Sequence, residues 1–265
     1  AFVQGEIEAD DIPALWNEKM DEYLGVVPDT DAEGCLQDIH WTSGFAGFQG
    51  STLASVVAFD FLETRVFGIP WPGYRDFPEL NLRFYLKHGD QRGVAFIRQN
   101  VPKRLIARMA RGFYNEPYVA APMYSRTQSD ETTHTFELGV EVGGREHVVR
   151  ATGPPPAFEP AHDTLAHYFK EHRWGFGTTR SGRTLTYEVD HPVWRVWPVQ
   201  SWSLDVDFSL LYGPEWEFLA TRDPFSVVFA QGSRVSVAPK GGLEDVTGEP
   251  MSPTPEALLS PPDEV

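Results

Sequence analysis

The sequence predicts an α+β fold whose centre is a mostly antiparallel, curled sheet or partly open barrel with two or three helices. Residues 79–87 alternate between apolar and polar side chains, a period of two that is typical of a strand with one buried face. Several such stretches are joined by Gly-containing turns into hairpins. Helical patterns are few and do not alternate regularly with the strands, which disfavours a parallel sheet of the dinucleotide-binding kind.

The strand over 79–87 is followed by the clearest hairpin and helix in the chain. Two Gly-containing turn dipeptides lead into a second strand over 94–101. Pro102 suits the first turn of a helix that runs to about Phe113, and the apolar residues of this helix form one stripe. We interpret its other side as a solvated face, which carries Arg104, Arg108 and Arg111.

The remaining elements are predicted from the same two periodicities. Further strands are expected over 53–61 and 118–124. Hairpins are expected over 135–151, 174–189 and 225–238. Helices are expected over 161–173 and 210–220.

Composition divides the chain into three segments. Residues 1–52 are expected to form a short helical N-terminal appendage, because residues 15–24 place apolar side chains at helical spacing. Residues 53–240 carry the predicted antiparallel β domain. Residues 241–265 are rich in Pro, Gly and acidic residues and are expected to be a disordered tail.

Charge and composition exclude several classes of partner. The net charge of −16 disfavours binding to nucleic acids and to anionic membranes, and no apolar run is long enough to span a bilayer. Cys35 is the single cysteine, so no internal disulfide is expected. No signal peptide is evident, so the expected location is cytoplasmic. We expect a small-molecule ligand, and the oligomeric state is left open.

A motif in the N-terminal segment resembles a known family. The stretch GCLQDIHW matches the pattern G-x-x-Q-D-x-H-W at every fixed position, namely Gly34, Gln37, Asp38, His40 and Trp41. It resembles the C-terminal part of the carboxypeptidase Taq family of zinc metallopeptidases, and the resemblance covers about the first 50 residues. A peptidase of this kind needs H-E-x-x-H to hold zinc, and no such motif occurs in the chain. We therefore predict an inactive peptidase relative without a metal site or any other cofactor.

Residues 53–240 resemble a second family. The stretch from SVVAFDF to YVAAPM, together with the later HPVWRVWPV, is similar to the YqjF-like family of bacterial proteins, known as domain of unknown function 2071. That family is distantly similar to acetoacetate decarboxylase, which implies a curled antiparallel sheet and an active site with a Schiff-base Lys in a P-K-K segment and an upstream Glu. Pro102-Lys103-Arg104 resembles that segment, and Glu79 resembles the upstream Glu.

Lys103 is also a candidate on physical grounds. An amine attacks a carbonyl only when it is neutral. The positive end of a helix, the adjacent charge of Arg104 and the apolar flank of the helix all disfavour the cation. The alternative interpretation is a solvent-facing Lys at a helix start. For Glu79 the alternative is an ordinary strand acid or an ion pair with Arg83.

Three hypotheses for function follow from these patterns. We favour a protein that binds a small organic ligand in a pocket of the curled sheet, with Arg83, Tyr85 and Tyr118 expected to line that pocket. The second hypothesis is a Schiff-base decarboxylase or lyase that uses Lys103, Glu79 and Arg104 as catalytic residues. The third is a peptidase relative, which rests on the N-terminal segment alone.

Overall fold

The computed structural model describes most of the chain between residues 52 and 242. The described residues are 2–7, 43–45, 52–65, 69–88, 91–113, 115–162, 164–169, 172–178, 184–221, 223–224, 226–238 and 241–242. The expected N-terminal helix and the GCLQDIHW motif lie outside these ranges. Of the tail expected to be disordered over 241–265, only Gly241–Gly242 is described, and it forms a short strand.

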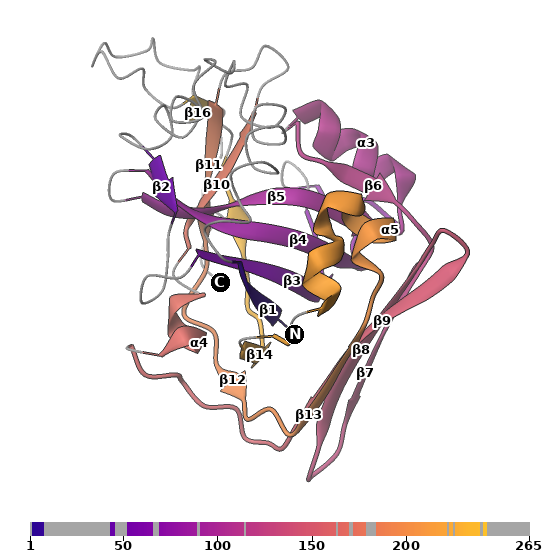
Figure 1. Cartoon of the computed structure of the whole chain (residues 1–265), viewed down its shortest axis with the longest axis vertical. Coiled ribbons are helices and arrows are strands. Elements are labelled where there is room, and N and C mark those ends of the chain that lie inside the picture. The colour runs from indigo at the N-terminus through magenta and orange to yellow at the C-terminus, as the bar shows by residue number, and fades with distance from the viewer. Residues whose placement is uncertain are drawn as a thin grey trace.

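The fold contains a 12-stranded mixed sheet that curls into a half-barrel and a separate 4-stranded antiparallel sheet (Figure 1). The main path of the large sheet runs in the order β12-β14-β1-β3-β4-β5-β10-β11-β15, while β2 pairs with β4, β6 with β5 and β16 with β11. Its strands are β1 (Phe2–Ile7), β2 (Ser43–Phe45), β3 (Thr52–Phe61), β4 (Phe77–His88), β5 (Gln91–Val101), β6 (Tyr118–Ala120), β10 (Trp174–Thr178), β11 (Thr184–Asp190), β12 (Val196–Trp197), β14 (Ser226–Ala230), β15 (Ser236–Val237) and β16 (Gly241–Gly242). The small sheet has the order β13-β9-β8-β7 and contains β7 (Met123–Ser129), β8 (His134–Val142), β9 (Arg145–Gly153) and β13 (Ser201–Asp205).

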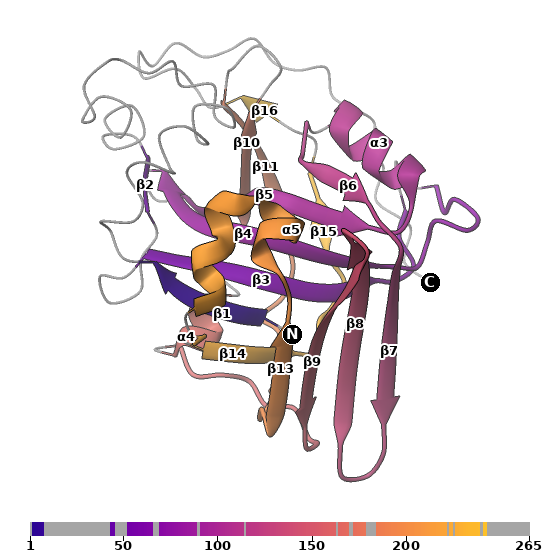
Figure 2. The same ribbon diagram turned by 45° about the vertical axis from the view of Figure 1, so that its right-hand side comes forward.

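Few helices accompany these sheets within the described ranges. They are α3 (Arg104–Phe113), α4 (Leu165–Tyr168), α5 (Phe208–Tyr212) and the 3-10 helix η2 (Pro214–Thr221). Helix α3 lies beside β6 at one end of the large sheet, whereas α5 lies across the large sheet on the side of the small one (Figure 2). The α+β class with a mostly antiparallel, curled sheet is thereby confirmed.

Strand β4 shows why the large sheet has two buried faces. Its residues alternate, so Leu80, Leu82 and Phe84 enter the main core, which α5, η2 and the small sheet cover. On the opposite face Tyr85 belongs to a second apolar cluster with α4, and Phe77 belongs to a third cluster with α3. Between Phe77 and Tyr85 this second face is polar, and it is there that the candidate site lies.

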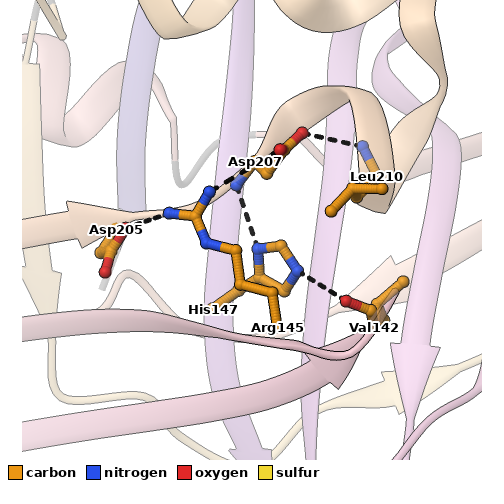
Figure 3. A network of polar contacts seen from close by, with 6 residues as sticks. All are labelled: Val142, Arg145, His147, Asp205, Asp207 and Leu210. Carbon is orange, nitrogen blue, oxygen red and sulfur yellow. Dashed lines mark hydrogen bonds and ion pairs between the residues drawn. The ribbon is translucent and has the colours of Figure 1, made fainter.

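A polar network attaches α5 to the small sheet (Figure 3). His147 on β9 is fully buried, and its Nδ1 accepts a hydrogen bond from the Asp207 backbone N–H at 3.0 Å. Because that N–H can only donate, Nε2 carries the ring proton and donates to the Val142 carbonyl at 3.2 Å. Asp207 is the N-cap of α5 and accepts from the Leu210 N–H at 2.9 Å, and Arg145 lies 3.7 Å from its other carboxylate oxygen.

Four sequence-based expectations need correction. The single strand expected over 118–124 is instead β6 and the start of β7, which belong to different sheets. The helix expected over 161–173 is limited to Leu165–Tyr168 among the described residues. The hairpin expected over 225–238 does not form, because β14 pairs with β1 and β12 while β15 pairs with β11. The single helix expected over 210–220 is instead the short α5 followed by η2, with Gly213 between them at a φ of 124°.

The N-terminal segment contributes two strands that the sequence patterns did not indicate. β1 pairs antiparallel with both β3 and β14, and β2 pairs with β4. The first 52 residues therefore supply backbone partners to the large sheet.

Candidate functional site: a buried pair of glutamates

The candidate site is built on the polar part of β4 and β5. Glu79 and Asn81 share one face of β4 because they are two residues apart. Gln99 of β5 lies directly opposite Asn81 in the antiparallel pairing. All of these side chains are almost fully buried, and Glu79 is only 1% exposed.

A second glutamate enters the site where one edge of β5 changes partner. That edge pairs in parallel with β10 near Val94 and with β6 from Gln99 onward. Residues 115–117 lead into β6 at this junction, and Asn115 adopts a φ of 55°, a conformation that Asn tolerates better than most residues. Pro117 favours an extended backbone at the preceding residue, Glu116, whose side chain is only 6% exposed.

Each glutamate accepts hydrogen bonds from one amide and one tyrosine. Glu79 accepts from Asn81 Nδ2 at 2.7 Å and from the Tyr118 hydroxyl at 3.0 Å. Glu116 accepts from Gln99 Nε2 at 3.1 Å and from the Tyr187 hydroxyl at 3.0 Å. We call these six residues the glutamate cluster.

Tyr187 reaches the cluster because glycine lies beneath its ring. Gly175 is its partner across the β10–β11 pairing, and a Cβ at Gly175 would lie 2.1 Å from Tyr187 Cζ. Gly177, two residues along β10, leaves similar room beside Glu116, whose Oε1 would lie 3.3 Å from an added Cβ. The Gly-x-Gly spacing in β10 thus admits both the ring and the carboxyl group.

Burial makes both carboxyl groups hold protons more tightly than free glutamate. Desolvation raises the pKa of Glu79 to about 7, and hydrogen bonds from Asn81 and Tyr118 oppose the shift, together with the charge of Arg83. Desolvation raises the pKa of Glu116 to about 8, and the negative charge of Glu79 adds to this increase. The pair therefore retains a proton at neutral pH.

A retained proton gives the site both donor and acceptor capacity. A protonated carboxyl group can donate to a carbonyl or carboxylate oxygen, whereas an ionised one can accept a proton. Asn81 Oδ1 is also buried and has no hydrogen-bond partner among the described residues, so it offers a free acceptor. These groups suit a small oxygen-bearing organic molecule or a proton transfer to one.

Of the three predicted pocket residues, only Tyr118 belongs to the glutamate cluster, while Arg83 and Tyr85 lie further along β4. Tyr118 belongs to the cluster, and its pKa is raised well above the usual value, first by desolvation and then by the charge of Glu79. Arg83 is half-buried, and its guanidinium carbon lies 5.6 Å from the centre of the Tyr85 ring. Tyr85 is fully buried, and its hydroxyl shares a 2.7 Å hydrogen bond with the Ser55 hydroxyl.

In the described part of the chain, the predicted catalytic cation makes no direct polar contact with the predicted catalytic acid. Lys103 is half-buried immediately before α3, and Arg104 is exposed in its first turn. Among the described residues no hydrogen bond or ion pair joins either of them to Glu79. The structure therefore brings Glu79 and Tyr118 together, but it shows no such contact for Lys103 and Arg104.

Sequence reasoning predicted Glu79 and Tyr118 as site residues but missed the other four members of the glutamate cluster. Glu116 lies in a stretch that has the composition of a turn, where an acidic residue is ordinarily solvated. Tyr187 and Gln99 lie in strands whose lateral order the sequence did not indicate. The available signal was Gly175-x-Gly177 opposite a tyrosine, because glycine in a strand interior often marks close approach of another group.

The described ranges contain no group of three His, Cys, Asp or Glu side chains arranged to hold a metal ion. They also contain no helix that is long and apolar enough to cross a membrane.

Comparison with protein families gives two matches. The model of domain of unknown function 2071, described as an uncharacterized conserved protein, matches residues 45–234. The chain is 27% identical to the uncharacterized protein YqjF of Bacillus subtilis over 148 residues, which are 56% of this chain and 60% of YqjF.

The N-terminal segment matches a different family. The model of the carboxypeptidase Taq metallopeptidases matches residues 1–65. Carboxypeptidase 1 of Bacillus subtilis is 50% identical over 48 residues, which are 18% of this chain but only 10% of the enzyme. The thermostable carboxypeptidase 1 of Thermus thermophilus is 38% identical over 64 residues, 24% of this chain and 12% of that enzyme.

Solved structures with the same fold include two enzymes. The enduracididine biosynthesis enzyme MppR, with HEPES buffer bound, has a TM-score of 0.55 at 13% identity, and the match covers 92% of this chain and 85% of MppR. Acetoacetate decarboxylase from Legionella pneumophila has a TM-score of 0.52 at 9% identity, and the match covers 93% of this chain and 85% of the decarboxylase. The fold of this chain is therefore that of acetoacetate decarboxylase.

Proposed function

The chain belongs to the domain of unknown function 2071 family, and from this premise we propose that it binds a small organic oxo acid or a related carbonyl compound at the glutamate cluster. One observation carries the proposal: Glu79 and Glu116 are 1% and 6% exposed inside one face of the sheet. Burying ionisable groups is costly, and strongly perturbed carboxyl groups concentrate at functional sites.

The chemistry of the cluster suits this class of ligand. Glu116 is the stronger candidate for donor, because its pKa of about 8 leaves it protonated at neutral pH. A protonated carboxyl group can donate to the oxygen of a carbonyl or carboxylate. Asn81 Oδ1, which lacks a partner in the described part of the chain, can accept from a ligand hydroxyl. The likeness to acetoacetate decarboxylase supports the same class.

Calorimetric titration with acetoacetate, pyruvate and acetone tests this function. We expect at least one compound to bind the full chain, and Glu116→Ala, which removes the donor that glutamine would keep, to weaken binding by about tenfold or more, as loss of a hydrogen bond to a charged group would. Glu137→Ala is the matched control, because Glu137 lies on β8 in the small sheet with Arg126 and Arg150 as its ion-pair partners. No binding by any of the three, or equal binding by both variants, would contradict the proposal.

A second candidate function is a Schiff-base lyase that uses Lys103. It is supported by the likeness to acetoacetate decarboxylase and by the pKa of about 7 at Glu79, which suits a group that transfers protons. In this reaction the Lys103 amine would add to the ketone carbon and release water to form an imine. Arg104 would lie next to the reacting amine in the chain, and Glu79 would move a proton in a later step.

Borohydride reduction separates the two functions. If Lys103 reacts, acetoacetate followed by borohydride should leave a stable adduct on the peptide that contains Lys103. Lys103→Ala should abolish this adduct, Lys87→Ala should retain it, and Glu79→Gln should retain it while slowing turnover. If adducts form on all lysines, or on none, the Schiff-base function is contradicted. Ligand binding without covalent chemistry then remains as the proposed function.

A further inference from the structure

An arginine-lined hollow lies where α3 meets β6, and no residue of the glutamate cluster lines it. Its volume is 470 Å³, and its lining residues are Arg104, Ala107, Arg108, Arg111, Gly112 and Ala120. Three arginines thus surround a floor of small residues contributed by α3 and β6. We call this feature the arginine hollow.

The charge of α3 is unusual for this chain. The protein has a net charge of −16, yet the ten residues of α3 contain three arginines and no acid. The arginines are four and three residues apart, so they are neighbours on one helix face, where like charges repel one another and destabilise the helix. The described residues place no carboxylate within ion-pair distance of Arg104 or Arg108. The repulsion is therefore uncompensated within this part of the protein.

One of the three guanidinium groups is held in place. Arg111 Nε donates a 2.6 Å hydrogen bond to the backbone carbonyl of Tyr118 on β6. This contact uses one donor of the guanidinium and leaves its other N–H groups available. Arg111 is therefore oriented before any ligand arrives, which reduces the entropy lost on binding.

The floor of the hollow is open. A Cβ built on Gly112 would meet nothing within 4 Å, and Ala107 and Ala120 contribute only methyl groups. A volume of 470 Å³ falls within the range of about 300–1,000 Å³ that small-molecule sites occupy. The hollow can accept the body of a ligand whose charged groups face the arginines.

We propose that the arginine hollow binds a small organic phosphate that carries two or more phosphoryl groups. Arg104 and Arg111 are seven residues apart, about 10 Å along the helix axis, which a single carboxylate does not span. Guanidinium groups bind phosphoryl oxygens in a bidentate manner, and each phosphoryl group supplies up to about two negative charges. Nucleic acid has the same anionic group, but the overall negative charge of the protein repels a long polyanion.

Inorganic pyrophosphate is the probe, titrated calorimetrically into the full chain, with inorganic phosphate and a single-stranded oligonucleotide as comparison ligands. We expect pyrophosphate to bind most tightly and Arg108→Gln to weaken it by at least about tenfold. Arg126→Gln is the matched control, because Arg126 is an exposed arginine on β7. Glutamine preserves helix propensity, so the circular dichroism and thermal midpoint of Arg108→Gln should match those of the native chain.

Gly112→Leu tests the shape of the hollow and leaves its charge unchanged. The added side chain has room at its Cβ and would occupy the floor, so pyrophosphate binding should be lost while the fold is retained. Absence of pyrophosphate binding by the native chain would overturn the proposal. So would equal binding by Arg108→Gln and Arg126→Gln, or tighter binding of the oligonucleotide.

Discussion

At the scale of single residues, the main consequence of the structure is that an acidic protein buries two acids which do not readily ionise. Glu79 and Glu116 share one polar region, and each ion would raise the pKa of the other. This arrangement couples the stability of the fold to pH in the direction opposite to that of ordinary salt-bridged carboxylates.

We predict that the native chain loses stability as the pH rises through neutrality. The reference pKa of 4.5 is raised to about 7 in Glu79 and about 8 in Glu116, so the folded state binds more protons between pH 4.5 and about 8. Within this window the free energy of unfolding falls with rising pH. Urea unfolding of Glu116→Gln should show a smaller fall, whereas Glu137→Gln should follow the native curve. Parallel curves for all three proteins would show that Glu116 does not titrate there.

Gly175 offers a second prediction at this scale. Alanine would place its Cβ 2.1 Å from Tyr187 Cζ, so the ring must move away from Glu116. We expect Gly175→Ala to lower the free energy of unfolding by about 1–3 kcal/mol, as overpacked interiors do. Gly112→Ala is the control, because that position is open and helical, and the change should be neutral or stabilise by up to about 1 kcal/mol. Equal urea midpoints for both variants would contradict this assignment.

At the scale of secondary-structure elements, helix α5 depends on one aspartate for two separate contacts. The Asp207 carboxylate caps the helix at the Leu210 N–H and lies 3.7 Å from Arg145. Asp207→Asn should keep the cap and lose only the exposed ion pair, while Asp207→Ala should lose both at a cost of about 1 kcal/mol. Urea unfolding that gave equal losses for both variants would mean that the cap contributes nothing.

The element scale also shows what the sequence could and could not predict. The alternation over 79–87 was sufficient to predict β4, because a strand with one apolar face has a local signature. The expectation of a single buried face was wrong, since Glu79 and Tyr85 on the opposite face are buried as well. The buried Glu116 had no such signature, since its burial depends on β10 and β6 meeting along one edge of β5. Lateral strand order is a non-local property, which also explains why the expected hairpin over 225–238 was wrong.

At the scale of the whole molecule, β1 bears on whether the chain divides into separate domains at residue 52. This strand fills the position between β3 and β14. A chain that lacks residues 1–7 should unfold at lower urea concentration, because both neighbours lose an antiparallel partner. Unchanged stability would favour residues 53–240 as a domain independent of the N-terminal segment.

The position of β1 also bears on how segments similar to two different families can meet in one chain. Residues 2–7 match the carboxypeptidases alone and β14 matches domain of unknown function 2071 alone, whereas β3 lies within residues 45–65, where the two matches overlap. Strand pairing is made by main-chain N–H and C=O groups, which every residue except proline possesses in full. The backbone groups that complete a sheet between two strands are therefore the same in any sequence, and a segment similar to another family can supply them.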